Sequence, residues 1–417
     1  MIMQLLKKTI TYGLLALGFS FATILSVEAA SFTSIKKIAE QGEVKAQVTL
    51  GDMYSDGEDV PQDYTEAVKW YRKAAEQGYP EAQLNLGYMY EEGQGVPKDD
   101  TKAVEWYRKA ANQNDVEAQT KLAYMYKKGQ GVPKDDTKAV EWYRKAADRG
   151  YASAQVSLGD MYLDDKGVPQ NYTEAVKWYR KAADQGDASG QYLLGYMYYF
   201  YGKGDQQDYA EAAKWYIKSA EQGYIPSQNA LGSLYLNGHG VPQSYTKALK
   251  WYRKPAEQGV VLAQYNTGYI YNHGYGVPQN YSEAAKWFRK AAEQGNDIAQ
   301  YDLGYMYQEG RGVRQDYAEA AKWYIKSAKQ GNSTSQLNLG VMYHNGKGVA
   351  QNYANAREWY LKAANQGNSL AQNNLGRMYY NGQGVAQSKI QAKEWFGKAC
   401  DNGNQDGCDD YKILNQK

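Results

Sequence analysis

The sequence predicts an all-α fold, an α/α right-handed superhelical solenoid of about ten 36-residue helix-turn-helix repeats. The first observation is the spacing of the ten tryptophans, which is 36 residues throughout except for one interval of 37. The second is the composition: 42 Tyr against 6 Phe among 417 residues is typical of one motif copied many times. The tryptophans are Trp70, Trp106, Trp142, Trp178, Trp215, Trp251, Trp287, Trp323, Trp359 and Trp395.

A single copy is enough to place the helices of each repeat. In the segment 81–90, apolar residues recur at helical spacing, which predicts a first helix, named helix A. The segment 91–100 holds two Gly and one Pro and predicts a loop. The segment 101–113 places Ala, Trp, Tyr and Ala at i, i+3, i+4 and i+7, which predicts a second helix, named helix B. One such pair cannot bury its aromatic side chains alone, so neighbouring repeats are expected to stack.

Polar residues mark the start of helix B in all ten repeats, and these types cap helices by accepting amide hydrogens of the first turn. Five repeats carry Glu three residues later, as in Asp63 and Glu66, which predicts a capping box. Helix B is expected to end at a Gly such as Gly78. A Lys three residues after each Trp, such as Lys73, is interpreted as a solvated charge at the negative helix end. The predicted N-caps are Asp63, Asp99, Asp135, Asn171, Asp208, Ser244, Asn280, Asp316, Asn352 and Ser388.

The beginning of the chain has the layout of a secretory signal peptide. Two lysines precede a mostly apolar run at 10–26, and Val27-Glu28-Ala29 fits a small-x-small cleavage site. The alternative is an uncleaved membrane anchor, although the run is short for a span of about 20 residues. We expect cleavage near Ala29 and a bacterial protein that is periplasmic or secreted. The predicted domains are the signal peptide at 1–29, the solenoid with a C-terminal capping helix at 30–414, and a tail at 415–417.

Composition and motifs argue against several functional classes. Lys and Arg number 48 against 46 Asp and Glu, and a net charge of +2 does not indicate the excess of basic residues that binds nucleic acid. Three His in different loop registers and two Cys form no metal-binding pattern. Ser-x-x-Lys occurs at Ser34 and Ser244, but the motifs that support it in serine β-lactamases are missing. We therefore expect a protein that is not an enzyme and uses no metal or other cofactor.

The repeated pattern resembles a known family. The motifs LG-x-MY-x-x-G-x-GV-P and KWYRKA are similar to those of Sel-like repeat (SLR) proteins, a subclass of tetratricopeptide-like solenoids. The resemblance covers about residues 36–414 and implies an adaptor that binds a protein or peptide. It extends to the secreted bacterial branch of the family, to which the Helicobacter cysteine-rich proteins belong. Some relatives in that branch carry a β-lactamase label. The alternative function is therefore a cell-wall (peptidoglycan) or β-lactam binding protein with weak or no hydrolase activity.

The resemblance also implies a disulfide. In the cysteine-rich branch, cysteines separated by seven residues are bonded within a repeat, and Cys400 and Cys408 have this spacing. Cys400 stands where other repeats have Ala, such as Ala75, and Cys408 where they have Gln, such as Gln83. The end of helix B and the start of the next helix A are therefore expected to be neighbours. A bridge there would hold the last helix, at about 405–414, on the solenoid.

Differences among the ten copies indicate which face is free to bind. Counted from the recurrent Gly of helix A, variation concentrates three and two residues before it and one and four residues after it, on one face of the helix. In this class of solenoid helix A lines the concave surface, so we interpret this face as a groove. The predicted groove residues are Tyr88, Tyr124, Tyr196, Tyr269, Tyr305, Asn85, Asn266, Asn338 and Asn374.

Tyrosine and asparagine favour recognition of an extended protein or peptide segment. Tyr offers a large amphipathic ring at low entropic cost, and Asn can pair with a peptide backbone. Two alternatives stay open: tyrosines that only pack between helices and leave the groove idle, and sugar binding by the same rings. The chain is expected to be a monomer.

Two repeats, counted by their Trp, interrupt the pattern. Repeat 5 carries the extra residue and four consecutive aromatics at 198–201 beside a loop. We interpret these first as a bulge packed on the neighbouring repeat and second as a contact site. Repeat 6 has Pro255 near the end of helix B, where other repeats mostly have Ala. Because Pro lacks an amide donor, it is expected to kink or shorten that helix and to change the curvature slightly.

Overall fold

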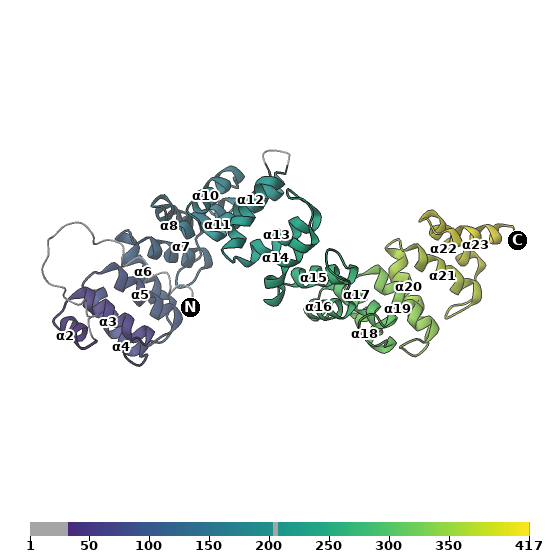
Figure 1. Cartoon of the computed structure of the whole chain (residues 1–417), viewed down its shortest axis with the longest axis horizontal. Helices are drawn as coiled ribbons and strands as arrows, with labels where there is room; N and C mark the ends of the chain where they lie inside the picture. Colours follow the sequence, from purple (N-terminus) through teal and green to yellow (C-terminus); the bar gives the residue numbers. More distant parts are fainter. Residues whose placement is uncertain (1–31, 203–206, 417) are drawn as a thin grey trace. The chain divides into compact units, whose positions relative to one another are not determined.

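The computed structural model describes residues 32–202 and 207–416. Within these ranges the protein consists of helices α2–α23, without a strand (Figure 1). The predicted all-α fold of tandem helix pairs is confirmed: repeat 1 is formed by α3 and α4, and each later pair forms the next repeat, up to α21 and α22 in repeat 10. The predicted signal peptide at 1–29 and residues 203–206 of repeat 5 lie outside the described residues.

The chain divides into two compact units between Arg149 and Gly150. The N-terminal unit holds α2 and repeats 1–3. Its helices are α2 (Phe32–Glu40), α3 (Val44–Asp56), α4 (Tyr64–Glu76), α5 (Pro80–Glu92), α6 (Asp100–Asn112), α7 (Val116–Lys128) and α8 (Asp136–Asp148).

The C-terminal unit holds repeats 4–10, followed by α23. Almost every helix has 13 residues, as the regular period of the sequence requires. The helices are α9 (Ala152–Leu163), α10 (Tyr172–Asp184), α11 (Ala188–Phe200), α12 (Tyr209–Glu221), α13 (Ile225–Asn237), α14 (Tyr245–Glu257), α15 (Val261–His273), α16 (Tyr281–Glu293), α17 (Asp297–Glu309), α18 (Tyr317–Lys329), α19 (Ser333–Asn345), α20 (Tyr353–Asn365), α21 (Ser369–Asn381), α22 (Lys389–Asp401) and α23 (Gln405–Asn415).

A glycine of helix A and an aromatic ring of helix B lie at the centre of each repeat. In repeat 2, a Cβ added to Gly87 would lie 2.5 Å from Cε1 of the fully buried Tyr107. The same close approach recurs in nine repeats, and repeat 3 has Ala123 in the glycine position. In these nine repeats the close packing of the two helices favours Gly, because a side chain would push the ring away, whereas repeat 3 accommodates the fully buried Ala123.

Helix B begins at the predicted N-cap in every repeat; in α4, Asp63 Oδ1 accepts from the backbone N–H of Glu66 at 3.1 Å. The predicted capping box is wrong. The backbone N–H of Asp63 already donates to the carbonyl oxygen of Tyr54 in helix A at 2.8 Å, so the Glu finds no free donor. Glu66 pairs with Lys69 instead, at 2.5 Å. Gly78 lies just beyond α4 with a φ of 90°, as expected for a helix terminator.

A buried glutamine links consecutive helices. Gln83 Nε2 donates to the carbonyl oxygen of Ala75 in α4 at 3.1 Å, and Gln83 Oε1 accepts from Gln113 Nε2, just beyond α6, at 2.9 Å. The glutamine-to-carbonyl bond recurs in nine repeats. Within the described residues, Oε1 of Gln119 and of Gln228 has no partner. The invariant Gln of helix A is thus a hydrogen-bonding position that ties neighbouring repeats together.

The Lys that follows each Trp by three residues lies over the indole ring, a contact that the sequence interpretation missed. In α6, Lys109 Nζ is 3.6 Å from the ring centroid of Trp106. The contact recurs in nine of the ten repeats, at up to 4.3 Å. The Lys is therefore a cation–π partner, which stabilises an exposed site by about 0.5–1 kcal/mol, and not only a solvated charge.

Pro255 lies inside α14 and does not shorten it. The helix has 13 residues, so the predicted shortening is wrong. Pro255 lies in the last turn, where it removes a single hydrogen bond, and its carbonyl oxygen still accepts from Val260 N at 2.9 Å to close the helix end. In repeat 6 the cation near the indole ring is Lys250, whose Nζ lies 5.7 Å from the Trp251 centroid.

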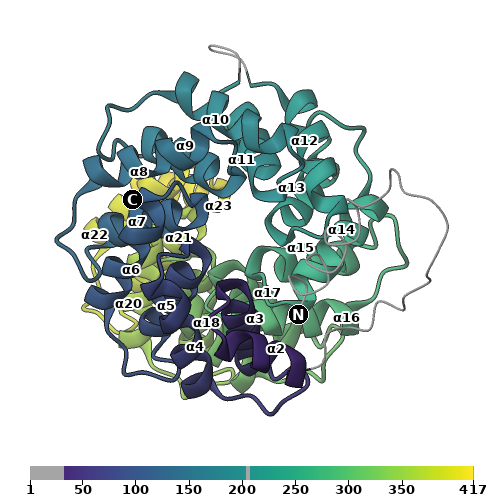
Figure 2. The same cartoon turned by 90° about the vertical axis from the view of Figure 1, so that its left-hand side faces the viewer.

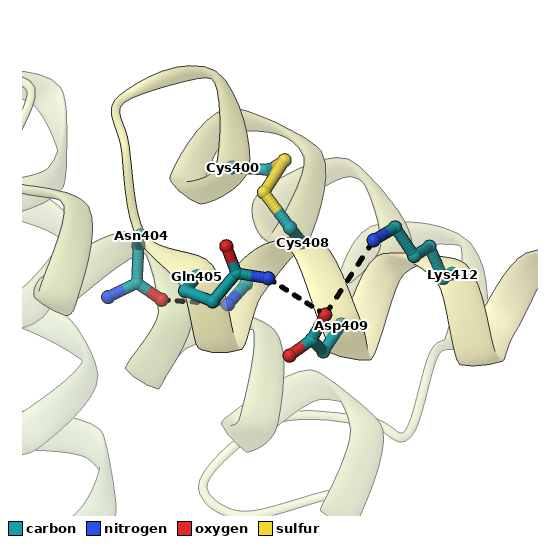
Figure 3. Close-up of a disulfide and its surroundings, with 7 residues drawn as sticks. Cys400, Asn404, Gln405, Cys408, Asp409 and Lys412 are labelled. Atoms are coloured by element: carbon teal, nitrogen blue, oxygen red, sulfur yellow. Dashed lines mark hydrogen bonds and ion pairs between the residues drawn. A yellow bond between two sulfur atoms is a disulfide. The ribbon is translucent and has the colours of Figure 1, made fainter.

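A disulfide joins α23 to α22. Cys400 and Cys408 are bonded through their Sγ atoms, with Cα atoms 4.5 Å apart (Figure 3). One repeat earlier, the equivalent residues make the glutamine link: Gln372 Nε2 donates to the Ala364 carbonyl oxygen at 3.1 Å. The covalent bond therefore stands where other repeats have this hydrogen bond, and it keeps α23 in the register of a helix A. Asn404 caps α23, because its Oδ1 accepts from Gly407 N at 2.7 Å.

Candidate functional site

The predicted groove residues share one face of the odd-numbered helices α5–α21. We call this the helix A face and define it by the residues one after and two before the recurrent Gly. Within the C-terminal unit, α11, α13 and α15 lie on the inner side of the turn and α10, α12 and α14 on the outer side (Figure 2). All nine predicted residues are half-buried or exposed, and Tyr124 is 40% exposed. The structure therefore leaves these side chains within reach of a partner.

In the N-terminal unit, part of this face forms an internal polar network. The hydroxyl of Tyr88 donates to Glu117 Oε1 at 2.6 Å, and Lys121 Nζ lies 4.5 Å from the Tyr88 ring centroid. Lys121 also pairs with Glu91 at 3.2 Å. Tyr88 is thus engaged by the next repeat, whereas Tyr124 is an open ring.

In the C-terminal unit, each predicted tyrosine contacts a neighbour in its own helix or in the loop that follows. The partners are Phe200 for Tyr196, His273 for Tyr269 and the guanidinium of Arg311 for Tyr305, at 4.5, 4.2 and 5.3 Å from the ring centroid. These contacts orient the rings but leave them half-exposed. Each of these tyrosines therefore packs on a neighbouring side chain and also keeps part of its ring accessible to a partner.

The predicted asparagines are anchored by the repeat before them. Asn266 Nδ2 donates to the hydroxyl of Tyr252 at 2.9 Å, and Asn85 Nδ2 donates to Asp52 Oδ1 of repeat 1 at 3.4 Å. Each bond uses one of the four hydrogen-bonding positions of the amide and fixes its orientation. Asn85 and Asn374 occupy the same register and are also half-buried.

The position three residues before the Gly is buried in four repeats and half-buried in the other six. Val48, Leu84 and Leu337 at this position are buried. Tyr192, at the same position in repeat 5, packs on Tyr216 of helix B with ring centroids 5.7 Å apart. In these repeats the residue at this position packs inside the helix pair, so part of its variation among the repeats reflects packing.

The four aromatics of repeat 5 divide into two pairs. Tyr198 is buried, and the Tyr199 hydroxyl lies 3.3 Å from His239 Nδ1 in the loop of repeat 6, as expected for a bulge packed on its neighbour. Phe200 and Tyr201 are 51% and 39% exposed. The packing interpretation therefore holds for the first pair, and the second pair remains open to solvent.

Asp302 is a titratable residue on the helix A face that was not among the predicted groove residues. It lies two residues before Gly304, in the register of the asparagines. Burial raises the pKa of its carboxyl group from 3.8 to about 6, opposed by a hydrogen bond with Tyr265 and by the charge of His273. The face therefore carries a group that changes charge just below neutral pH.

Asp302→Asn is expected to raise the free energy of unfolding by about 2 kcal/mol near neutral pH and to leave it almost unchanged at acid pH. Because the pKa is raised in the folded chain, the folded chain holds the proton more tightly than the unfolded chain. The contribution of Asp302 to stability is therefore greatest below the unfolded pKa of 3.8 and is lost as pH rises through the folded pKa of about 6. Urea unfolding of both chains across this range checks the prediction, and parallel pH profiles would contradict it.

The helix A face offers phenol hydroxyls, amides and aromatic rings, which suit hydrogen bonding and ring contacts with a partner. Over residues 32–202 and 207–416, no three His, Cys, Asp or Glu side chains gather in a way that could hold a metal ion. In the same part of the chain, every helix is too short or too polar to cross a membrane.

A family model described as the Sel1 repeat matches ten consecutive segments of the chain. Each segment contains one helix A and the helix B that follows, so the sequence repeats and the structural repeats coincide. The segments are 44–79, 80–115, 116–151, 152–187, 188–224, 225–260, 261–296, 297–332, 333–368 and 369–404.

Solved structures show the same similarity. A protective antigen present in uropathogenic Escherichia coli strains, displaying an SLR fold, is 39% identical with a TM-score of 0.68, over 92% of this chain and 90% of its own. A Sel1 repeat protein from Oxalobacter formigenes is 34% identical with a TM-score of 0.56, over 80% and 99%. Helicobacter pylori cysteine rich protein B is 25% identical with a TM-score of 0.25, over 30% and 94%. No curated protein matches the chain. With ten matching segments in phase with its helix pairs, the chain belongs to the Sel1 repeat family.

Proposed function

We propose that the protein is an exported adaptor, not an enzyme, that binds a protein or peptide segment across the helix A face of its C-terminal unit. The layout of residues 1–29 supports export, and a disulfide suits an oxidising compartment such as the periplasm or the exterior. The similar E. coli protein is described as a protective antigen, which also fits a location outside the cytoplasm.

One observation carries the binding proposal: repeats 7–9 present half-buried rings, amides and a carboxyl group at the same two positions of the helix A face. Tyr269 and Tyr305 follow each other one repeat apart, and Asn266 and Asn338 accompany them on the same face. An extended segment that crosses repeats 7–9 meets a polar side chain in each repeat, from Asn266, Asp302 and Asn338. It also meets a ring in the first two of these repeats, from Tyr269 and Tyr305. Such a series suits a peptide, whose side chains and backbone groups are also regularly spaced.

The test is affinity capture from an envelope extract with the mature chain as bait. Replacing Tyr196, Tyr269 and Tyr305 by Ala is expected to reduce capture of the partner by about tenfold or more, because central tyrosines carry much of the binding energy of an interface. The matched control replaces three exposed lysines on helix B of the same repeats by Ala and is expected to capture like the parent. These lysines are Lys214, Lys286 and Lys322.

Circular dichroism and unfolding midpoints first establish that both triple variants are folded. If the folded tyrosine variant captures as much partner as the parent, the helix A face is not the binding site and the proposal is wrong. If the lysine variant loses the partner and the tyrosine variant keeps it, the site lies on helix B.

A further inference from the structure

Repeat 7 shows how a tyrosine of the helix A face is enclosed. Tyr269, which follows the recurrent Gly, lies beside the residue seven places after that Gly, which is Tyr275 in the loop, with ring centroids 5.9 Å apart. Tyr275 in turn stacks on Tyr245, the first residue of the preceding helix B, at 4.6 Å. Three elements, helix A, its loop and the preceding helix B, thus form one cluster.

Repeat 8 builds the same cluster with a cation in the loop position. The guanidinium carbon of Arg311 lies 5.3 Å from the ring centroid of Tyr305 and 5.8 Å from that of Tyr281, the first residue of the preceding helix B. The tyrosine after the Gly is therefore a member of the cluster in both repeats, whether the loop residue is aromatic or charged.

Repeat 9 keeps two members of the cluster and lacks the third. Lys347 takes the loop position, and its Nζ lies 5.4 Å from the ring centroid of Tyr317, the first residue of the preceding helix B. Val341, 37% exposed, stands where Tyr269 and Tyr305 stand in their repeats. A pocket of about 210 Å³ opens at this place, and Val341, Lys347 and Tyr317 all line it.

The polar groups of this pocket are held in position by one another. The hydroxyl of Tyr324 donates to Gln308 Oε1 at 3.2 Å. Gln308 Nε2 then donates to Glu309 Oε1 at 2.9 Å. Asn338, Gln308 and Glu309 line the pocket. A ligand therefore meets amide and carboxylate groups that are already ordered, which lowers the entropy lost on binding.

We propose that this pocket binds one tyrosine side chain of the partner, which completes in repeat 9 the cluster that repeats 7 and 8 build from their own tyrosines. Its volume of about 210 Å³ exceeds the roughly 150 Å³ of a cavity that accepts benzene, so a phenol ring fits. Lys347 offers the ring a cation–π contact, as Arg311 does for Tyr305. Glu309 and the amides supply acceptors for the hydroxyl, which an aliphatic side chain cannot use. The inference rests on the proposed function and specifies what the partner inserts.

The probe is N-acetyl-tyrosinamide, titrated into the full mature chain and followed by ligand-observed NMR, with N-acetyl-leucinamide for comparison. The parent is expected to bind the tyrosine derivative about tenfold more tightly than the leucine derivative. Val341→Tyr fills the pocket with the residue that repeats 7 and 8 hold, so it is expected to fold like the parent and to bind the tyrosine derivative at least about tenfold more weakly. Equal affinity of the parent for both probes, or equal affinity of parent and variant for the tyrosine derivative, overturns the inference.

A double variant moves the pocket by one repeat. Adding Tyr305→Val to Val341→Tyr removes the ring next to Arg311 and opens the equivalent pocket in repeat 8. The double variant is therefore expected to bind N-acetyl-tyrosinamide again. If the double variant folds but does not bind N-acetyl-tyrosinamide, the pocket does not arise from the missing tyrosine of the cluster.

The titration needs no natural partner and tests only the pocket. If it fails, the proposed function is still tested separately by the capture experiment. If capture depends on the three tyrosines of the helix A face but Val341→Tyr captures like the parent, the adaptor function stands and the pocket is not where the partner inserts a tyrosine.

Discussion

Replacing Gly240 by Ala is expected to lower the free energy of unfolding by about 4 kcal/mol, measured by urea unfolding followed by far-UV circular dichroism. Gly240 lies in the loop after α13 with a φ of 66°, and an added Cβ would lie 2.1 Å from the carbonyl oxygen of Tyr209, the first residue of α12. A backbone oxygen at a helix start cannot move aside as the end of a side chain can. The loop of repeat 6 would have to withdraw from repeat 5, and the packing of the two repeats would be disturbed.

Gly259 provides a matched control in the same repeat. Its φ is 90°, but no atom lies within 4 Å of an added Cβ. Gly259→Ala therefore adds only backbone strain and is expected to cost about 1 to 2 kcal/mol. Equal losses in the two variants would show that the backbone conformation alone, and not the close approach of the preceding repeat, requires glycine at position 240.

The helix pairs were predictable because their signals are local and occur ten times. The N-cap Asp63, for example, acts on the first turn of its own helix, and its register is the same in every repeat. The capping box was predicted wrongly because the competing acceptor, the carbonyl oxygen of Tyr54, belongs to another helix. The contact of Lys73 with Trp70 is different: the two residues are one helical turn apart, so the sequence did contain the signal.

The helix A face could be located from the sequence, but its contacts could not. Variation among the copies placed the tyrosines on one side of each helix, whereas the hydrogen bond from Tyr88 to Glu117 depends on how two repeats pack. The pocket of repeat 9 likewise needs Tyr317 and Lys347, which come together only in the folded chain. A sequence signal for it did exist, because Val341 is the only aliphatic residue in its register.

The glutamine links hold neighbouring repeats in register along the helix A face. A complete link joins the end of one helix B, the buried helix A after it, and the end of the next helix B, as Gln83 does with Ala75 and Gln113. A hydrogen bond in a buried site is directional and leaves an expensive unpaired group when it is broken. Apolar packing alone would tolerate small shifts of one repeat on another, and such shifts would change the spacing of the tyrosines.

Gln336→Met is therefore expected to lower the free energy of unfolding by about 3 kcal/mol, measured by urea unfolding. Gln336 is buried, its Nε2 donates to the Ala328 carbonyl oxygen at 3.0 Å, and its Oε1 accepts from Gln366 at 2.8 Å. Met has a similar length and fills the same space. It offers no comparable polar group, so the buried carbonyl of Ala328 loses its donor and Gln366 loses an acceptor.

Gln228 is the matched control, because its link is incomplete. It is buried and donates to the Ala220 carbonyl oxygen at 3.1 Å, but its Oε1 has no partner within the described residues. Gln228→Met breaks one hydrogen bond and also removes an unsatisfied buried oxygen, so its expected cost is only about 1 kcal/mol. If both variants lose the same stability, the bond from Gln366 to Gln336 contributes nothing, and the register of neighbouring repeats rests on apolar packing instead of on the glutamine links.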